Sequence, residues 1–294
     1  MKEQYLAIDI GGTFIKYSVM NKQYEVLEEY VQPTKKEPEA FLNQLLGIGK
    51  EYKDKVEGVA LCIAGFINPE TGENTDFGIS ERFKAYNLKE ELENITKLPV
   101  ILENDSNCAA LGEMVCGSAK EVSDFCLLTI GTGIGGAIVL NKQLVRGKHF
   151  KAGEAGYMLI GLNENGEQVN GESAGATSVL VKKVSEIVGK EIDGMYVFKH
   201  LDNPEIYKIY KHWIYKNAVV VGNMALLLDP EVVLIGGGIS HEKRFIDDLR
   251  KAVFEIYPHF EEYTKILPCK MGNLAGRVGA LYLWLEKYGK KNES

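Results

Sequence analysis

Two glycine-rich turns, each following an apolar run, could bind phosphate groups. The first lies in AIDIGGTFIK, residues 7–16, and the second in LTIGTGIGGAIV, residues 128–139. Glycine lets backbone N–H groups approach phosphate oxygens closely, and successive N–H groups form an anion-binding concavity. In the first turn, Thr13 could add a hydroxyl donor and Lys16 a positive charge. The alternative for each turn is an ordinary hairpin without a ligand.

Two further features could complete a nucleotide site. Asp9 ends the apolar run before the first turn, where its carboxylate could hold a hydrated magnesium ion. A solvent-facing Asp is the alternative. The third glycine run lies in VVLIGGGIS, residues 232–240, where bare backbone would let an adenine or ribose lie close. By itself this run does not identify a site.

Two acidic motifs could act on a polyol. In LENDSNCAALGE, residues 102–113, Asp105 stands where a strand should give way to a helix, with Asn104 beside it. Phosphoryl transfer needs such a base to orient a hydroxyl and accept its proton, but Asp is also a favoured helix N-cap. In AGEAGYM, residues 152–158, Glu154 could grip vicinal hydroxyls through charge-assisted hydrogen bonds. A solvated loop carboxylate is the alternative there.

The residues on either side of both glycine turns have the pattern of β-strands. Apolar runs at 5–10 and 14–20 flank the first turn, and runs at 125–130 and 137–140 flank the second. A strand–glycine–strand hairpin differs from the strand–turn–helix of a dinucleotide-binding unit. Two such hairpins indicate duplication of a nucleotide-binding half.

The rest of the chain alternates helical and strand patterns around a long irregular stretch at 64–87, of the kind that is often functional. We place a domain boundary near Gly117. Further strands are expected at 24–30, 58–63, 99–102, 232–235 and 265–267, and helices at 37–53, 89–96, 106–115, 176–188, 206–228, 243–256 and 274–288.

Composition excludes several classes of function. The 294 residues are 45% hydrophobic and carry a formal net charge of -7, so a nucleic-acid backbone would be repelled. The five cysteines are scattered without a CxxC pair, which favours neither a zinc site nor a disulfide framework. No signal-peptide pattern and no run near the ~18 apolar residues of a membrane span occur. We expect a cytoplasmic protein with no membrane or nucleic-acid partner.

Taken together, the motifs resemble the ROK family of bacterial sugar kinases and related repressors. DIGGTFIK, ENDSNCAALGE, TIGTGIGGAIV, GEAGY and LIGGGIS occur in the family's order over residues 7–240, and AGRVGALYLW resembles its closing helix. The resemblance implies an α/β fold of two actin-like (ribonuclease H-like) domains with an interdomain cleft that binds ATP and sugar. The domains would be 1–117 and 118–294, with the last helix, 274–288, able to pack back onto the first.

The resemblance also implies roles for individual residues. Asp105 matches the catalytic base, and Asp9 would hold Mg²⁺ through water. Glu172 is the nearest match to a further sugar-binding Glu, in an alignment ambiguous by about one residue. The implied sugar ligands are Gly65, Asn104, Asp105, Glu154 and Glu172, and the implied ATP ligands are Asp9, Gly11, Gly12, Thr13, Lys16, Gly131, Thr132, Gly133, Gly136 and Gly237.

This chain departs from the family pattern at its zinc site. Tyr157 stands where many members have His, and the following stretch, residues 163–178, has neither Cys nor His. We therefore expect no structural zinc, and some other packing must order that loop.

The expected activity is ATP-dependent phosphorylation of a sugar hydroxyl, the 6-hydroxyl of a glucosyl unit in a β-glucoside such as cellobiose. An N-acetylmannosamine kinase or a glucokinase is the alternative. A transcriptional regulator of the family would carry a helix-turn-helix domain before the first strand, but only four residues precede it. A scaffold would not need Asp105 beside Asn104. The resemblance further implies a homodimer.

Overall fold

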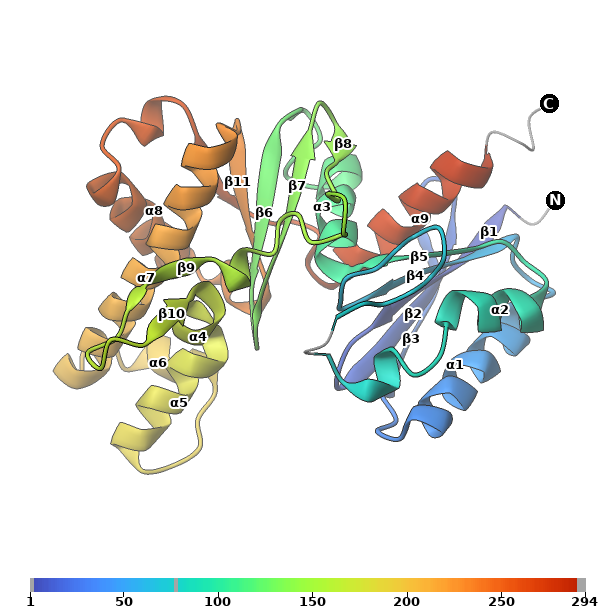
Figure 1. The fold of residues 1–294 in the computed structure, drawn as a ribbon, viewed down its shortest axis with the longest axis horizontal. Helices are drawn as coiled ribbons and strands as arrows, with labels where there is room; N and C mark the ends of the chain where they lie inside the picture. The colour runs from blue at the N-terminus through green and yellow to red at the C-terminus, as the bar shows by residue number, and fades with distance from the viewer. Residues whose placement is uncertain (1–2, 77–78, 290–294) are drawn as a thin grey trace. The chain divides into compact units, whose positions relative to one another are not determined.

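The protein folds into two compact units, each built on its own mixed sheet (Figure 1). The computed structural model describes residues 3–76 and 79–289. Phe77 and Gly78 of the predicted irregular stretch, and the Lys-rich end, lie outside the described residues. The first unit runs to Lys120 and also contains Arg146–Lys151 and the chain from Asn273; the second contains Glu121–Val145 and Ala152–Gly272.

The first sheet has the strand order β3-β2-β1-β4-β5. Its first three strands are antiparallel, and β1, β4 and β5 run parallel. Every residue of β4 is buried, as expected of a parallel strand covered on both faces. The strands are β1 (Gln4–Ile10), β2 (Phe14–Asn21), β3 (Val26–Pro33), β4 (Gly58–Ile63) and β5 (Val100–Asn104).

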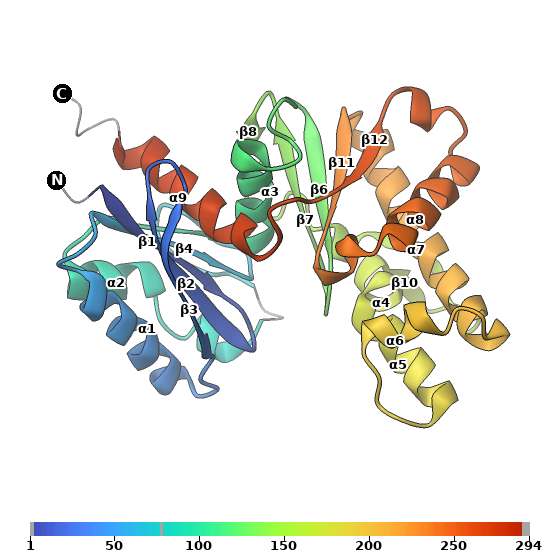
Figure 2. The same ribbon diagram turned by 180° about the vertical axis from the view of Figure 1, so that it is seen from behind.

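Helices cover both faces of this sheet (Figure 2). α1 (Pro38–Tyr52) and α2 (Leu88–Thr96) pack on one face, and α3 (Asp105–Cys116) and α9 (Ala275–Tyr288) on the other. Because side chains alternate along a strand, Leu6, Ile8 and Ile10 enter the core under α1 and α2. Asp9 therefore points to the opposite face, toward α3 and α9.

One segment of the second half of the sequence packs with the first unit. Arg146–Lys151 lies within the predicted C-terminal domain, yet two contacts tie it to unit 1. Arg146 Nε donates to the buried carboxylate of Glu103 at 2.6 Å, and Lys151 Nζ lies 4.9 Å from the centre of the Phe66 ring.

The second sheet has the order β12-β11-β6-β7-β8, which repeats the order of the first sheet. In both sheets the first three strands form an antiparallel meander and the last two add in parallel. This is the topological duplication that the two glycine hairpins indicate. The strands are β6 (Phe125–Ile130), β7 (Ile134–Leu140), β8 (Gln143–Leu144), β11 (Val232–Gly236) and β12 (Lys265–Pro268).

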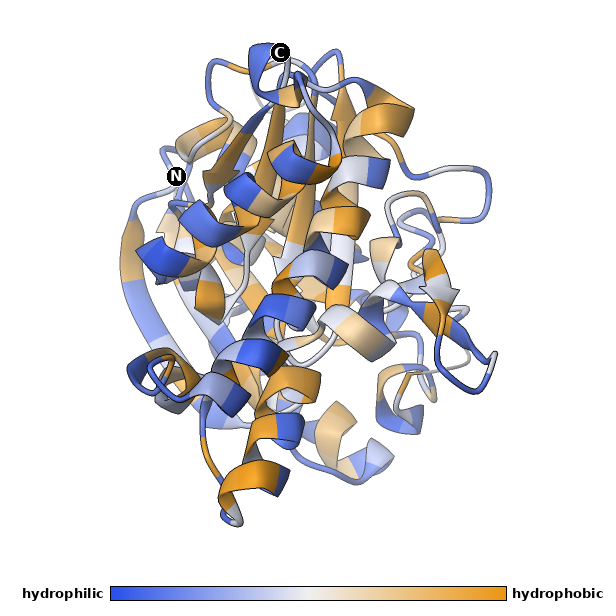
Figure 3. Cartoon of the chain, turned by 90° about the vertical axis from the view of Figure 1, so that its left-hand side faces the viewer, coloured by the Kyte–Doolittle hydropathy of each residue, from blue (hydrophilic) through white to orange (hydrophobic). Residues whose placement is uncertain are grey.

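Helices and a small hairpin complete the second unit. Its strands are mostly apolar, whereas its helices carry both polar and apolar stretches (Figure 3). No helix in the described part of the chain is both long and apolar enough to cross a bilayer. The helices are α4 (Gly171–Gly175), α5 (Thr177–Val188), α6 (Gly194–Lys199), α7 (Pro204–Leu228) and α8 (Lys243–Ile256), and the hairpin is β9 (Leu159–Leu162) and β10 (Gln168–Asn170). Short 3₁₀ turns are η1 (Glu81–Phe83), η2 (Ala155–Tyr157), η3 (Gly238–His241), η4 (Phe260–Glu262) and η5 (Gly272–Leu274).

The structure differs from the sequence prediction mainly around glycines and short elements. β7 begins at Ile134 and not at 137, because its glycines serve a close backbone approach: a Cβ on Gly136 would lie 2.3 Å from Gly153 O. The helix predicted at 176–188 is preceded by the separate turn α4. The short elements β8, β9, β10 and α6 were not predicted.

The contact between α3 and α9 requires glycine. A Cβ on Gly279 would lie 1.8 Å from the carbonyl oxygen of Cys108, so Gly279→Ala must push the two helices apart. We expect this substitution to lower the free energy of unfolding by about 1–3 kcal/mol, the usual cost of overpacking.

Gly47→Ala is the matched control, because Gly47 also lies inside a helix but has no heavy atom within 4 Å of its Cβ position. The higher helix propensity of Ala should stabilise that variant by up to about 1 kcal/mol. Equal midpoints of thermal or urea unfolding for the two variants would contradict the proposed helix contact.

Candidate functional site

Three successive carbonyl groups of the first glycine turn accept hydrogen bonds from outside the turn. Thr34 Oγ1 donates to Gly11 O at 2.8 Å, and Thr34 N donates to Thr13 O at 2.9 Å. Between them, Arg82 Nη2 donates to Gly12 O at 2.7 Å. Each of these three carbonyl groups therefore has a hydrogen-bond donor from outside the turn.

The N–H side of the same turn is open. In a trans peptide the C=O and N–H groups point in opposite directions, and the described chain has no cis peptide. Holding Gly11 O and Gly12 O outward therefore aims the N–H groups of Gly12 and Thr13 away from the tethers. Neither N–H group has a protein partner among the described residues. Two adjacent unpaired donors form a cradle for an anion.

The second turn repeats this arrangement with other residues. Thr177 N donates to Gly131 O at 2.8 Å, and Ser178 Oγ donates to Thr132 O at 2.6 Å. Gly133 O accepts from Gly131 N at 2.9 Å. The N–H groups of Thr132 and Gly133 consequently point the other way, and neither has a partner within the part of the chain described.

Glu172 packs directly against the second turn. Its Oε2 accepts a hydrogen bond from Ile134 N at 3.0 Å, and a Cβ on Gly133 would lie 2.5 Å from the same oxygen. Gly133 is therefore needed for the approach of this carboxylate. The structure thus places Glu172 beside the predicted phosphate turn, in the first helical turn of α4.

Glu154 is held near the same hairpin by backbone packing. Gly153 has φ +89°, and a Cβ on Gly156 would lie 2.4 Å from Ile134 O. Glu154 stands between them, at the start of η2, and is half-buried. Its loop therefore lies against β7.

The loop that lacks Cys and His is ordered by polar turns. Asn163 Oδ1 accepts hydrogen bonds from the N–H groups of Asn165 and Glu167 at the tip of the β9–β10 hairpin. Asn170 and Ser173 then form a reciprocal capping box that starts α4. Tyr157, in place of the family's His, is 60% exposed.

A cavity of about 390 Å³ opens next to the second turn. Gly131 and Thr132 line it, and Gly238 and Ile239 of η3 line it too. Gly237, the N-cap of η3, has φ +89°, and a Cβ there would lie 2.1 Å from Ile130 O, so no other residue fits. The third glycine run therefore lies beside the second turn in the same unit.

Sequence reasoning missed most of the cavity's other lining residues. Thr177 Oγ1 is buried and has no hydrogen-bond partner among the described residues, so it can serve a ligand. Met195 and Phe198 of α6 supply an apolar surface for a flat ring. No sequence signal marked α6, because it is only six residues long.

Asp105 is not the cap of its helix. Asn104 is the N-cap of α3, and its Oδ1 accepts from Asn107 N at 2.9 Å. The carboxylate of Asp105 accepts a hydrogen bond from Ser106 N at 2.8 Å, and Asp105 is half-buried. The alternative that Asp105 is only a capping residue therefore fails.

The surroundings of Asp105 favour its neutral form. Burial, followed by the nearby Asp9 carboxylate, raises the pKa of Asp105 to about 6, and the hydrogen bond from Ser106 opposes the shift. Burial likewise raises the pKa of Asp9, against the charges of Lys16 and Arg277. Two carboxyl groups near each other with raised pKa values are typical of a functional site.

Asn104 and Lys16 are engaged with neighbouring loops. Asn104 Nδ2 donates to Gly65 O at 3.0 Å, where Gly65 has φ +119°. Lys16 lies opposite Asp9 in the β1–β2 ladder, and its Nζ donates to Asn273 Oδ1 at 2.8 Å.

The predicted residues fall into two groups, one in each unit. Within each group, neighbouring loops and turns bring the residues together. Unit 1 contains Asp9, Gly11, Gly12, Thr13, Lys16, Gly65, Asn104 and Asp105, and unit 2 contains Gly131, Thr132, Gly133, Gly136, Glu154, Glu172 and Gly237.

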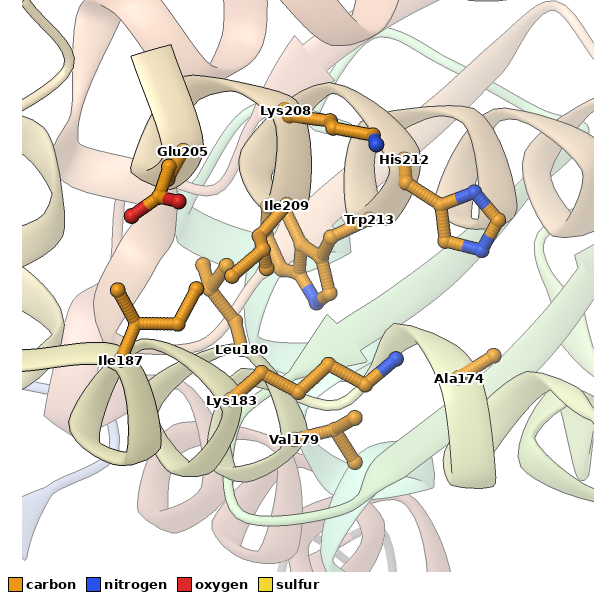
Figure 4. A pocket seen from close by; sticks show the side chains of 10 residues that line it. All are labelled: Ala174, Val179, Leu180, Lys183, Ile187, Glu205, Lys208, Ile209, His212 and Trp213. Atoms are coloured by element: carbon orange, nitrogen blue, oxygen red, sulfur yellow. The ribbon is translucent and has the colours of Figure 1, made fainter. Parts of the chain in front are cut away.

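A larger groove contains none of the predicted residues. It has a volume of about 460 Å³ and lies between α5 and α7 (Figure 4). Lys183, Lys208 and His212 stand over an apolar floor that includes Trp213. Burial and the charges of nearby lysines lower the pKa of His212. Because none of the three glycine runs lines it, size alone does not make it the candidate site.

Comparison with known proteins gives consistent matches over nearly the whole chain. The model of the ROK family matches residues 5–287. The β-glucoside kinase of Listeria monocytogenes is 35% identical over 96% of this chain and 97% of that protein. A ROK family protein from Streptococcus pneumoniae, solved with sucrose, has a TM-score of 0.86 at 30% identity and covers 98% of this chain and 99% of its own.

A third match supports the fold alone. The ROK family glucokinase of Streptomyces griseus, solved with glucose and AMPPNP, has a TM-score of 0.80 at 24% identity, with coverage of 95% of this chain and 98% of its own. These matches confirm the predicted fold of two actin-like domains.

The tether on the second turn can be tested directly. Ser178→Ala removes the donor that holds Thr132 O, which should free the peptide that presents Gly133 N–H. Loss of one such hydrogen bond is worth about 0.5–1.5 kcal/mol, so we expect the Kd for Mg·AMPPNP to rise roughly 2- to 10-fold.

Ser185→Ala, in the same helix, is the control, because no hydrogen bond of its side chain holds the turn. Isothermal titration calorimetry of both variants gives the comparison. An unchanged Kd for Ser178→Ala would contradict the tether.

Proposed function

Because the chain belongs to the ROK family, we propose that this ATP-dependent sugar kinase phosphorylates the 6-hydroxyl of a glucosyl unit in a β-glucoside such as cellobiose. The observation that carries the proposal is the pair of turns whose carbonyls are tethered and whose N–H groups are free. Phosphoryl transfer depends almost entirely on positioning and on stabilising charge. Two cradles of N–H donors supply both.

Each glycine turn would bind nucleotide phosphates. Thr132 and Gly133 would donate N–H groups to phosphate oxygens, and the adenine would lie between η3 and the side chains of Met195 and Phe198. Gly12 and Thr13 would hold phosphate oxygens in the same way.

Asp105 would accept the proton of the sugar hydroxyl. Its pKa of about 6 leaves it ionised near neutral pH, yet basic enough to take a proton as the oxygen attacks phosphorus. Its position at the N-terminus of α3 stabilises the anion. Asn104, Gly65 and Glu154 would bind other hydroxyls of the sugar.

The residues present fit a hydrated magnesium ion. Mg²⁺ is commonly held by one or two carboxylates and by substrate phosphates, with several waters retained, and Asp9 offers one half-buried carboxylate beside the first turn. When bound, the ion would neutralise phosphate charge. Asp9 would hold and orient it, and we expect no zinc.

The substrate proposal rests on the β-glucoside kinase of Listeria monocytogenes, at 35% identity. ATP turnover measured against cellobiose, gentiobiose, glucose and N-acetylmannosamine tests it. We expect the highest kcat/KM with a β-glucoside. Faster turnover of glucose or N-acetylmannosamine would reassign the substrate, and turnover of none would reject the proposed reaction.

Two broader expectations accompany this proposal. We expect a homodimer in solution from the family resemblance, and a cytoplasmic location from the composition of the sequence.

Asp105→Asn should nearly abolish turnover while sugar and nucleotide still bind, because the amide keeps the shape but cannot accept the proton. General-base catalysis typically contributes about 100- to 10,000-fold. Steady-state kinetics with calorimetric binding of cellobiose and AMPPNP measure both effects. More than about a tenth of the original kcat would contradict the assignment.

The pH profile should report the same group. A base must be deprotonated, so raising the pKa of Asp105 to about 6 predicts that kcat/KM is level above that pH and falls as pH drops through it. The expected acid limb falls about tenfold per pH unit. An acid limb centred near pH 4, the usual range of Asp, would show that burial does not raise the pKa of Asp105.

A further inference from the structure

Arg82 makes an unexpected contact with the first phosphate turn. It belongs to η1, in the irregular stretch that begins near Gly65, and lies far in sequence from the turn it touches. Its Nη2 donates to Gly12 O at 2.7 Å, and its Nη1 donates to Lys35 O at 3.4 Å. A Cβ on Gly12 would lie 3.8 Å from the same Nη2.

The guanidinium group is held in place by the core. It lies over the ring of Phe83, 4.8 Å from the ring centre. Phe83 is buried and packs edge-on against Phe41 of α1, with centroids 5.4 Å apart. The buried Phe83 therefore fixes the position from which Arg82 reaches the turn.

Stability alone does not account for this placement. Arg82 Nε is buried without a hydrogen-bond partner among the described residues. A buried donor without a partner is unfavourable, so the local structure tolerates a cost to keep the guanidinium at the turn.

We infer that Arg82 is a positioning residue for the nucleotide phosphates, an inference that rests on the proposed function. By holding Gly12 O, it fixes the peptide whose other end is Thr13 N–H. A charged donor on the carbonyl also polarises that peptide, which strengthens the N–H group as a donor to an anion. Arg82 thus acts on the phosphate through the backbone and does not touch it.

The effect should depend on the phosphates of the ligand. Arg82→Ala should raise the Kd for Mg·AMPPNP about 10-fold, since hydrogen bonds to charged groups are the stronger class. The Kd for adenosine, which has no phosphate, should stay within about twofold. Arg82→Gln keeps side-chain N–H donors without the charge. Its Kd for Mg·AMPPNP should fall between those of the unaltered protein and Arg82→Ala.

Lys84→Ala is the matched control. Lys84 directly follows η1 and pairs with Glu81 at 3.7 Å, so its loss removes one positive charge from the same region without touching the turn. Both of its Kd values should match those of the unaltered protein. Thermal melting checks that every variant is folded.

Three results would overturn the inference: an AMPPNP Kd within twofold of the original in Arg82→Ala, an equal rise for AMPPNP and adenosine, or an equal rise in Lys84→Ala. Failure of the proposed function shows differently, as no sugar phosphorylation by the unaltered protein. The AMPPNP comparison still tests Arg82 in that case. If the unaltered protein bound no AMPPNP, both proposals would fall.

Discussion

The geometry of the peptide group is the constraint on which the proposed site depends. A trans peptide cannot turn its carbonyl one way without turning its N–H the other way. Both glycine turns use this fact: donors outside each turn hold its carbonyls, and the N–H groups are left facing open space.

Different residues hold the carbonyl groups of the glycine turn in each of the two units. Thr34 and Arg82 tether the first turn, whereas Ser178 and the backbone of Thr177 tether the second. The sheets that carry the turns share one strand order. Topology and backbone geometry are therefore shared by the halves, although the sequences that produce them differ.

The acidic residues are also placed by the backbone. Strand alternation turns Asp9 to the face covered by α3 and α9, where burial and then the charge of Asp9 raise the pKa of Asp105. On that face, a Cβ on Gly276 of α9 would lie 3.9 Å from the carboxyl carbon of Asp9, so the helix backbone passes close to this carboxylate. The close helix packing and the chemistry of the site are thus linked.

The parts of the site that glycine specifies were predictable from sequence, and the tethers were not. Gly133, Gly136 and Gly237 signal a backbone requirement by their residue type, and a Cβ at each would lie too close to a neighbouring atom. Arg82 and Ser178 act on a carbonyl, which any donor can do, so their types carry no signal. The structure assigns the helix cap to Asn104 and not to Asp105, which the sequence alone could not show because both residue types cap well.

The short helix α6 shows the same limit of sequence reasoning. Its six residues are too few to establish a helical period, yet Met195 and Phe198 line the cavity beside the second turn. Its N-cap, Asp193, accepts from Tyr196 N at 2.8 Å, a contact that is clear only once the turn is folded.

The most direct test is an amide NMR titration of the ¹⁵N-labelled protein with Mg·AMPPNP and, separately, with adenosine. The account predicts that the amide protons of Gly12, Thr13, Thr132 and Gly133 move downfield with AMPPNP and scarcely move with adenosine. If these four resonances stayed in place at saturating AMPPNP while the α6 resonances shifted, the tethered turns would not be the phosphate site.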